Sequence, residues 1–205
     1  MAALMPEGAC NVCDPQALAA MLRSDPALAA RWGALPRRAF DAGAALQRAG
    51  DNATRCWLVE RGVVRLFYLN EQGTERNRSF HGTGSWVGGS LPPLVVPSPY
   101  AIEALSRVDT VELDYATLRQ WQSAHPQLEG IVAQALGHVF TQQSQREAEL
   151  LSLTAQARYT LFLTAYGPLV PQIPQHHVAS YLGISPVSLS RIRARMGLAD
   201  GQRGA

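Results

Sequence analysis

A short stretch near the C-terminal end, residues 176–193, carries side chains suited to binding an anion. It reads HHVASYLGISPVSLSRIR, and arginines stand at 191, 193 and 195. A guanidinium is always charged, and its planar fork of donors matches a phosphate or the acceptor edge of guanine. All 18 basic residues of the chain are arginine and none is lysine, so this chemistry is the chain's only permanent cation.

The spacing around these arginines predicts two helices joined by a tight turn. Val178 and Leu182 fall four apart on one helical face, and Gly183 follows, where helices commonly end at positive φ. Ser185 is a good N-cap and Pro186 a good first residue for the next helix. The stretch is therefore predicted to be a helix-turn-helix.

The second helix is predicted to bury Leu189, Ile192 and Met196 and to expose its other face. On that face Arg191 can pair with guanine, Ser188 with a base or phosphate, and Val187 with a thymine methyl group. Arg193 and Arg195 are predicted to contact phosphates. The candidate DNA-binding residues are Ser185, Pro186, Val187, Ser188, Arg191, Arg193 and Arg195.

The basic excess of the chain lies in the same segment. From residue 174 onward there are four arginines and one acid, giving +3, whereas residues 1–173 carry 14 arginines and 15 acids, giving −1. This distribution favours an anionic partner for the C-terminal part, although a solvated basic tail would give the same count. Nothing in the sequence resembles a nucleophile with its base or a phosphate-binding loop, so an enzyme is not expected.

The elements before this stretch fall into two groups. Between about residues 38 and 114, short β-prone runs such as CWLVE and VVRLFYL alternate with glycine-containing turns, which predicts a small antiparallel barrel or sandwich. LPPLVVPSP is too rich in proline for a central strand and is predicted to be a loop. Asp14-Pro15 is predicted to start an N-terminal helix.

The region from residue 115 to 167 is predicted to be helical. A short helix is expected from Tyr115 to His125, a long one from Pro126 to about Ser152, and a third after Thr154. The long helix carries a stripe that fits either a coiled-coil dimer seam or a helix packed on its own barrel. The stripe consists of Leu128, Val132, Ala135, Val139, Gln142, Arg146, Glu149 and Leu153.

The chain resembles the Crp/Fnr transcription regulators. The resemblance rests on CWLVERGVVRLFYLNEQGTERNRSFHGTGSWVG and on VASYLGISPVSLSRIR. It implies an α+β fold with an N-terminal, cyclic-nucleotide-binding-like antiparallel β-roll, a long dimerisation helix and a C-terminal helix-turn-helix domain. We expect a helical segment with CxxC at 1–33, the sensor roll at 34–125, the dimerisation helix at 126–153 and the DNA-binding domain at 154–205. The final GLADGQRGA is too short for the family's β-hairpin, so a reduced or absent wing is expected.

The resemblance also implies a homodimer that binds a near-palindromic site on double-stranded DNA and works with RNA polymerase. Cyclic-AMP-binding members carry a Gly-Glu pair and a downstream arginine, but here Gly88 is followed by Gly89, and no arginine occurs between Gly88 and Ala104. A buried phosphate would lack its counter-charge, so weak or no cyclic AMP binding is expected. The candidate effector pocket is Gly88, Gly89 and Ser90, with Arg107 as a substitute cation.

The three cysteines leave the sensor chemistry open. Cys10 and Cys13 form a CxxC pair, and Cys56 is the third. Oxygen-sensing members of the family hold a four-iron cluster on four cysteines, and this chain is one ligand short. The pair is incidental, a thiol–disulfide switch, or part of a metal or iron–sulfur site.

Two function classes remain at this stage. The first is a transcription regulator whose roll senses a signal other than cyclic AMP. The second is a ligand-binding signalling module whose helix-turn-helix is a protein-interaction surface. The sequence contains no signal peptide and no apolar run as long as a membrane span, so a cytoplasmic protein without a membrane partner is expected.

Overall fold

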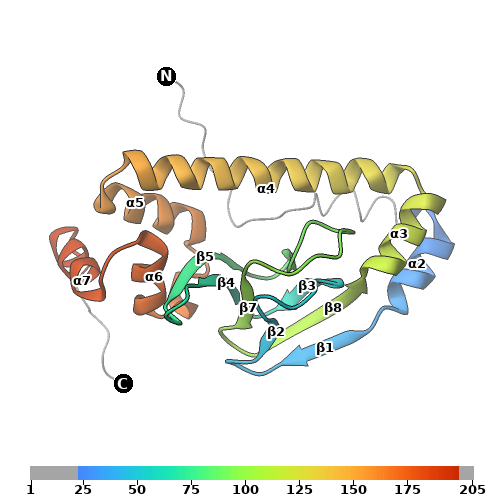
Figure 1. Ribbon diagram of the computed structural model, residues 1–205, viewed down its shortest axis with the longest axis horizontal. Coiled ribbons are helices and arrows are strands. Elements are labelled where there is room, and N and C mark those ends of the chain that lie inside the picture. The colour runs from blue at the N-terminus through green and yellow to red at the C-terminus, as the bar shows by residue number, and fades with distance from the viewer. Residues whose placement is uncertain (1–22, 199–205) are drawn as a thin grey trace.

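The structure is a computed structural model, and it describes residues 23–198. A β-roll occupies the centre, one long helix lies along one side of it, and the C-terminal helices gather at one end (Figure 1). The α+β fold expected from the sequence is confirmed. The predicted N-terminal helix start at Asp14-Pro15 and the residues after Leu198, where the wing was considered, lie outside the described residues.

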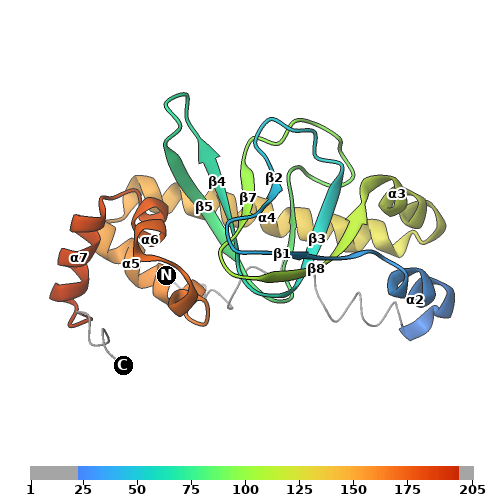
Figure 2. The ribbon, with the colours of Figure 1, turned by 90° about the horizontal axis from the view of Figure 1, so that it is seen from below.

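The roll consists of two four-stranded antiparallel sheets (Figure 2), ordered β1-β8-β3-β6 and β2-β7-β4-β5. The predicted proline-rich loop after Gly88 is confirmed, since the chain forms no strand between the end of β6 at Gly88 and the start of β7 at Ala101. The strands are β1 (Arg37–Phe40), β2 (Ala45–Gln47), β3 (Arg55–Arg61), β4 (Val64–Leu69), β5 (Glu75–His81), β6 (Trp86–Gly88), β7 (Ala101–Ala104) and β8 (Val108–Asp114).

The hairpin of β4 and β5 has two features that position later side chains. Asn70 Oδ1 accepts hydrogen bonds from the backbone N–H groups of Gln72 and Thr74, at 3.0 and 2.7 Å, and closes the loop. Further along, Leu66 pairs with Ser79 but Phe67 pairs with Asn77. The residue between them on β5, Arg78, is therefore the extra residue of a β-bulge, a device that redirects the side chains of a strand.

The helical half begins where the sheets end. The helices are α2 (Pro26–Gly33), before the roll, and α3 (Tyr115–Ala124), α4 (Gln127–Ser152), α5 (Ala155–Tyr166), α6 (Gln175–Leu182) and α7 (Pro186–Arg195) after it, with a 3₁₀ turn at Val170–Gln172. Side-chain N-caps start four of the described helices: Asp25 accepts from Leu28 N–H, Asp114 from Thr117 N–H, Thr154 from Ala157 N–H and Ser185 from Ser188 N–H. Within the described part of the chain, no helix combines the length and apolar character needed to cross a membrane.

The stripe predicted on α4 faces the body of its own chain. Leu128 is buried in the core beside α3, and Val132 packs against the same cluster. Arg146 pairs with Glu149 at 3.0 Å and stacks over the ring of Tyr181, 3.9 Å from its centroid. Of the two alternatives left open by periodicity, this packing favours a helix covering its own roll.

An aromatic cluster joins the roll to the C-terminal helices. Phe80 of β5 lies 5.6 Å from Tyr166 and 5.8 Å from Tyr181, measured between ring centroids, and Phe162 lies within 6.1 Å of it. All four side chains are buried. Edge-on aromatic pairs of this kind add to the hydrophobic effect, so the helix-turn-helix is packed against the roll.

Candidate nucleic-acid interface and internal cavity

The turn between α6 and α7 has the geometry predicted from its residues. Gly183 ends α6 at φ +71°, a conformation that favours glycine. Pro186 is the first residue of α7, and Ser185 accepts from the backbone N–H of Ser188 at 3.2 Å. Leu182 and Leu189 are fully buried between the helices. The two helices therefore form a compact helix-turn-helix.

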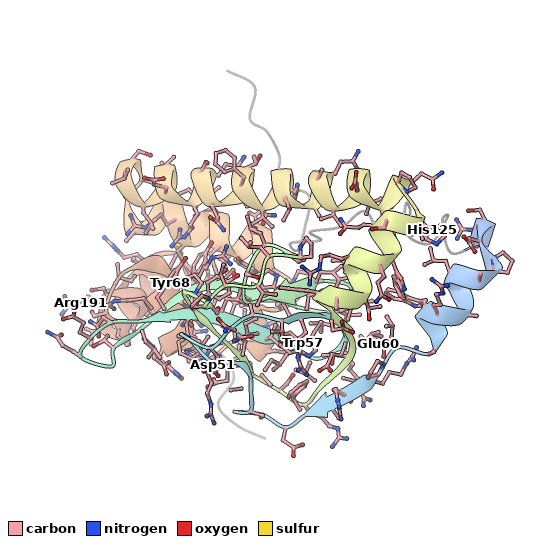
Figure 3. All side chains as sticks on the ribbon, turned by 45° about the vertical axis from the view of Figure 1, so that its right-hand side comes forward. Asp51, Trp57, Glu60, Tyr68, His125 and Arg191 are labelled. Atoms are coloured by element: carbon pink, nitrogen blue, oxygen red, sulfur yellow. The ribbon has the colours of Figure 1, made fainter. Side chains whose placement is uncertain are left out.

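The outer face of α7 is open to solvent. Val187 is 62% exposed, and Ser185, Pro186, Arg191 and Arg195 are also exposed. Arg191 lies at the edge of the molecule in Figure 3. Residues 174–198 contain no acid, so nothing in this segment neutralises the arginines. This face is an exposed cationic surface of the width that a major groove accepts.

Two of the seven residues predicted to contact DNA, Ser188 and Arg193, are less exposed than the other five. Ser188 is half-buried, with its hydroxyl 2.9 Å from that of Ser185. Arg193 is also half-buried, and its guanidinium donates to the hydroxyl of Tyr159 at 3.3 Å. The structure thus groups six of the seven residues at the start and on the outer face of α7 and turns Arg193 partly inward.

Helix α6 is docked on strand β5. The backbone N–H of Asn77 donates to the Ser180 hydroxyl at 3.0 Å, and its side-chain amide donates to the His177 carbonyl at 3.1 Å. The Ser180 hydroxyl in turn donates to the carbonyl of Glu75 at 3.2 Å. Because the docking uses α6, the outer face of α7 stays uncovered.

A buried arginine lies behind this contact. The side chain of Arg65 is 4% exposed and pairs with Glu103 at 2.8 Å and with Glu75 at 2.6 Å. Its guanidinium also lies 3.3 Å from Nδ1 of His177. Burial, and after it the charge of Arg65, lowers the pKa of His177 to about 4, so the imidazole is neutral at pH 7.

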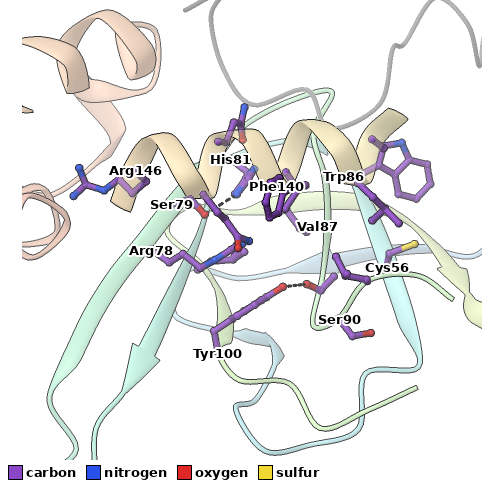
Figure 4. A pocket seen from close by; sticks show the side chains of 18 of the residues that line it. Cys56, Arg78, Ser79, His81, Trp86, Val87, Ser90, Tyr100, Phe140 and Arg146 are labelled. Atoms are coloured by element: carbon purple, nitrogen blue, oxygen red, sulfur yellow. Dashed lines mark hydrogen bonds between the residues drawn. The ribbon is translucent and has the colours of Figure 1, made fainter. Parts of the chain in front are cut away.

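A cavity of about 940 Å³ separates α4 from the roll (Figure 4). Most of its wall is apolar or aromatic, and the polar groups come mainly from β5, the loop after β6 and the end of α4. The apolar wall includes Leu66, Trp86, Val87, Leu113, Val132 and Phe140. A volume of this size is in the range of small-molecule sites.

Strand β5 brings a histidine and an arginine to the cavity wall. His81 is 5% exposed, and its Nε2 lies 2.9 Å from the hydroxyl of Ser79. Its Nδ1 has no hydrogen-bond partner among the described residues. Burial, and secondarily the charge of Arg78, lowers the pKa of His81 to about 3. The guanidinium of Arg78 lies over the ring of Tyr100, 4.7 Å from its centroid.

The predicted effector residues are only partly brought together. Gly88 and Ser90 line the cavity. Arg107 does not line it; it follows β7 and pairs with Asp41 at 3.6 Å on the surface. The sequence reasoning missed Arg78 and His81, because a bulge in β5 decides which side chains face the cavity.

The structure leaves no room for a side chain at Gly89. A Cβ at this position would lie 2.9 Å from Gln47 Cγ, 2.9 Å from Ser98 Oγ and 3.0 Å from Ala53 Cβ. Carbon atoms do not approach that closely without displacing their neighbours. The space beside Gly89 is thus filled by the protein's own side chains.

The cysteines lie in two parts of the chain. Cys56 is buried on β3 beside the cavity, and its thiol donates to the carbonyl of Leu113 at 3.6 Å. Cys10 and Cys13 lie outside the described residues. Within residues 23–198, no three His, Cys, Asp or Glu side chains are close enough together to hold a metal ion.

This architecture is similar to that of known proteins. Residues 37–125 match the family described as the cyclic nucleotide-binding domain. No curated protein sequence matches the chain. The structure of FixK2 from Bradyrhizobium japonicum superposes with a TM-score of 0.70 at 18% identity, covering 83% of this chain and 89% of FixK2.

Two further solved structures are similar over most of their length. CLP, described as a c-di-GMP responsive global regulator of Xanthomonas campestris, gives a TM-score of 0.67 at 17% identity and covers 93% of this chain and 96% of its own. A CooA mutant from Carboxydothermus hydrogenoformans gives 0.64 at 14% identity, with coverage of 82% and 80%. These likenesses show the fold: the chain has the fold of the Crp/Fnr regulators, with a cyclic nucleotide-binding domain as its roll.

Proposed function

We propose that the chain is a sequence-specific, DNA-binding transcription regulator that acts as a homodimer on a near-palindromic site and whose roll senses a signal other than cyclic AMP. The observation that carries the proposal is the uncovered outer face of α7, which presents Val187, Arg191 and Arg195 on the Crp/Fnr fold. In a helix-turn-helix the second helix enters the major groove, and its exposed side chains meet base edges. RNA polymerase is the proposed protein partner, and the cytoplasm the proposed location.

The proposed dimer uses exposed residues of α4, and those in its C-terminal half also border the open side of the cavity. Phe140 is 72% exposed and Leu151 is 82% exposed, eleven residues apart and thus on nearly the same side of the helix. Other exposed residues of α4 lie on the same side, spaced alternately three and four residues apart. They have small or short side chains, except for one glutamate. The exposed set is Gly130, Ala133, Gly137, Phe140, Ser144, Glu147 and Leu151. This heptad spacing is typical of a two-stranded seam with closely packed helices.

The proposed signal is not a cyclic nucleotide because the glutamate and the arginine expected after Gly88 in cyclic-AMP-binding members are absent from this sequence. Protein side chains fill the space beside Gly89, and Arg107 does not line the cavity. Cys10 and Cys13 remain a proposed redox or metal sensor. If serine substitution of both leaves DNA binding equally sensitive to oxidants, that part of the proposal fails.

The DNA proposal is tested by selecting bound sequences from a random duplex library at one stated salt concentration, with and without reductant. We expect an enriched near-palindrome whose half-sites are one helical turn apart. Arg191→Ala should relax the preference at one base pair of each half-site, by about 1–3 kcal/mol. Arg61→Ala, on the surface of the roll, is the matched control and should keep the full preference.

The competing function, a signalling module whose helix-turn-helix binds a protein, predicts a different result. It requires no enriched DNA sequence in either condition and no effect of Arg191→Ala. An enriched site that is unchanged by Arg191→Ala would instead show that another surface reads the DNA.

The dimer is tested by analytical ultracentrifugation of the full chain. Phe140→Glu places a charge in the proposed seam and should shift the protein to monomer. Because Phe140 is largely exposed in the single chain, folding should be preserved. Gln134→Glu adds the same charge about 120° round the helix and should remain dimeric. Equal association of the two variants would rule this seam out.

A further inference from the structure

The cavity between α4 and the roll contains a buried polar atom without a partner. His81 Nδ1 makes no hydrogen bond with any described residue, although the side chain is 5% exposed. Buried polar groups are nearly always hydrogen-bonded, because an unsatisfied one costs about 1–3 kcal/mol. The ring lies in the wall of a cavity large enough for a small molecule, so a bound molecule is the natural partner for this atom.

A cation stands on the same wall. Arg78 is the bulged residue of β5, half-buried, with its guanidinium over Tyr100. It forms no ion pair with any described residue. Bulges next to binding sites commonly redirect one side chain, and here the bulge lets Arg78, Ser79 and His81 line one cavity. Arg78 therefore keeps its charge available to a ligand.

We infer that this cavity binds an organic monoanion other than a cyclic nucleotide, with an apolar or aromatic body, whose acid group is held by Arg78 and His81. The inference names the effector class of the proposed function and rests on it for the link to DNA. Neither the contact of Arg78 with the Tyr100 ring nor that of His81 Nε2 with Ser79 competes with such an acid group.

The charge and hydrogen-bond count of the site fits a single acid group. His81 is neutral at pH 7, so Arg78 is the one cation of this pair. When the Ser79 hydroxyl donates to Nε2, Nδ1 carries the proton and can donate to a ligand oxygen. The other charged cavity residues are Arg76 and the α4 residues Arg146, Glu147 and Glu149, of which Arg146 and Glu149 pair with each other. Leu66, Val87 and Leu113 supply apolar surface for the rest of the molecule.

Strand β5 gives the site a route to the helix-turn-helix. Asn77, next to Arg78, donates to both Ser180 and His177 of α6. Phe80, next to His81, packs on Tyr181 of α6. A ligand bound to Arg78 and His81 therefore contacts strand β5, on which the helix-turn-helix is docked.

Binding is tested on the full chain at pH 7.5 with three probe acids: 1-naphthoate, octanoate and 1-anilinonaphthalene-8-sulfonate. Binding is followed by tryptophan emission, since Trp32, Trp86 and Trp121 line the cavity, and by calorimetry. The neutral comparison is 1-naphthamide, and cyclic AMP is the comparison for a monoanion that also needs a ribose contact. We expect 1-naphthoate to bind more tightly than 1-naphthamide and cyclic AMP not to compete.

Variants identify the residues involved. Arg78→Gln should weaken 1-naphthoate by about tenfold to a hundredfold and leave 1-naphthamide unchanged. His81→Leu should weaken the acid with its fold intact by circular dichroism. Arg107→Gln removes a surface arginine outside the cavity and is the matched control.

Three outcomes would overturn the inference: no binding of any probe acid up to about 1 mM, equal affinity of the acid for wild type and Arg78→Gln, or displacement of the acid by cyclic AMP. The measurement uses no DNA, so it can succeed where the DNA selection fails. Binding of the acid, with no enriched DNA site even when the acid is present in the selection, would retain the cavity assignment and reject the regulator.

Discussion

Helix α7 and the interior of the roll use arginine in opposite ways. Arg191 and Arg195 are exposed, in a segment without any acid. Arg65 is buried between Glu75 and Glu103 and contacts the docked α6 through His177. The comparison teaches that a guanidinium is available to a partner only where the fold has not already paired it. Arg78 stands between the two, since it is half-buried yet unpaired within the described chain.

The largest effect should come from removing the buried arginine. Arg65→Met leaves the half-buried Glu103 and the buried Asn77 without their donor, and breaking a buried pair in this way costs about 3 kcal/mol. Urea unfolding followed by circular dichroism measures the change. Arg61→Met removes an exposed pair with Asp109 and should cost less than about 1 kcal/mol. An equal loss of unfolding free energy in the two variants would contradict the distinction between a buried, paired arginine and an exposed one.

The second effect is a change of stability with pH in the roll interior. The pKa of His81 is about 3 in the folded chain and 6.5 in the unfolded one, so between these values only the unfolded chain binds the proton. The free energy of unfolding therefore falls as pH drops from 6.5, by about 1.4 kcal/mol per pH unit for this group. His81→Leu should flatten the wild-type slope between pH 6 and 4 by that amount, although His177, whose pKa is about 4, keeps part of it. A variant slope equal to that of the wild type would mean that His81 titrates normally.

The smallest effect concerns Arg195, which faces outward, and Arg193, which is half-buried against Tyr159. Arg195→Ala should lower the slope of log K against log salt by about 0.9, without changing the preferred sequence, because one phosphate contact is lost. Arg193→Ala should lower it less, since Tyr159 already holds that guanidinium. Fluorescence anisotropy at several salt concentrations measures both slopes. A larger loss for Arg193 would show that its contact with Tyr159 breaks on DNA.

The parts predictable from the sequence are those with local signals. Gly183, Ser185 and Pro186 set the ends of two helices through contacts within four residues, so the helix-turn-helix could be read directly. The strands were readable from alternation and turns. Which face of α4 packs on the chain, and which β5 residues reach the cavity, depends on contacts between distant segments and on one bulge. Arg107 was considered and Arg78 overlooked for that reason.

The bulge at Arg78 also determines how many residues strand β5 must have. Side chains of a strand alternate between its two sides, so removing one residue reverses the facing of everything beyond it. The extra residue places Asn77 and Phe80, three apart, against the C-terminal helices, and turns Ser79 and His81 to the cavity. Deletion of Arg78 alone would reverse the facing of the residues on one side of it, so the contacts with the C-terminal helices and those with the cavity would not both form. The number of residues in β5 is therefore fixed by two sets of contacts, one with the C-terminal helices and one with the cavity.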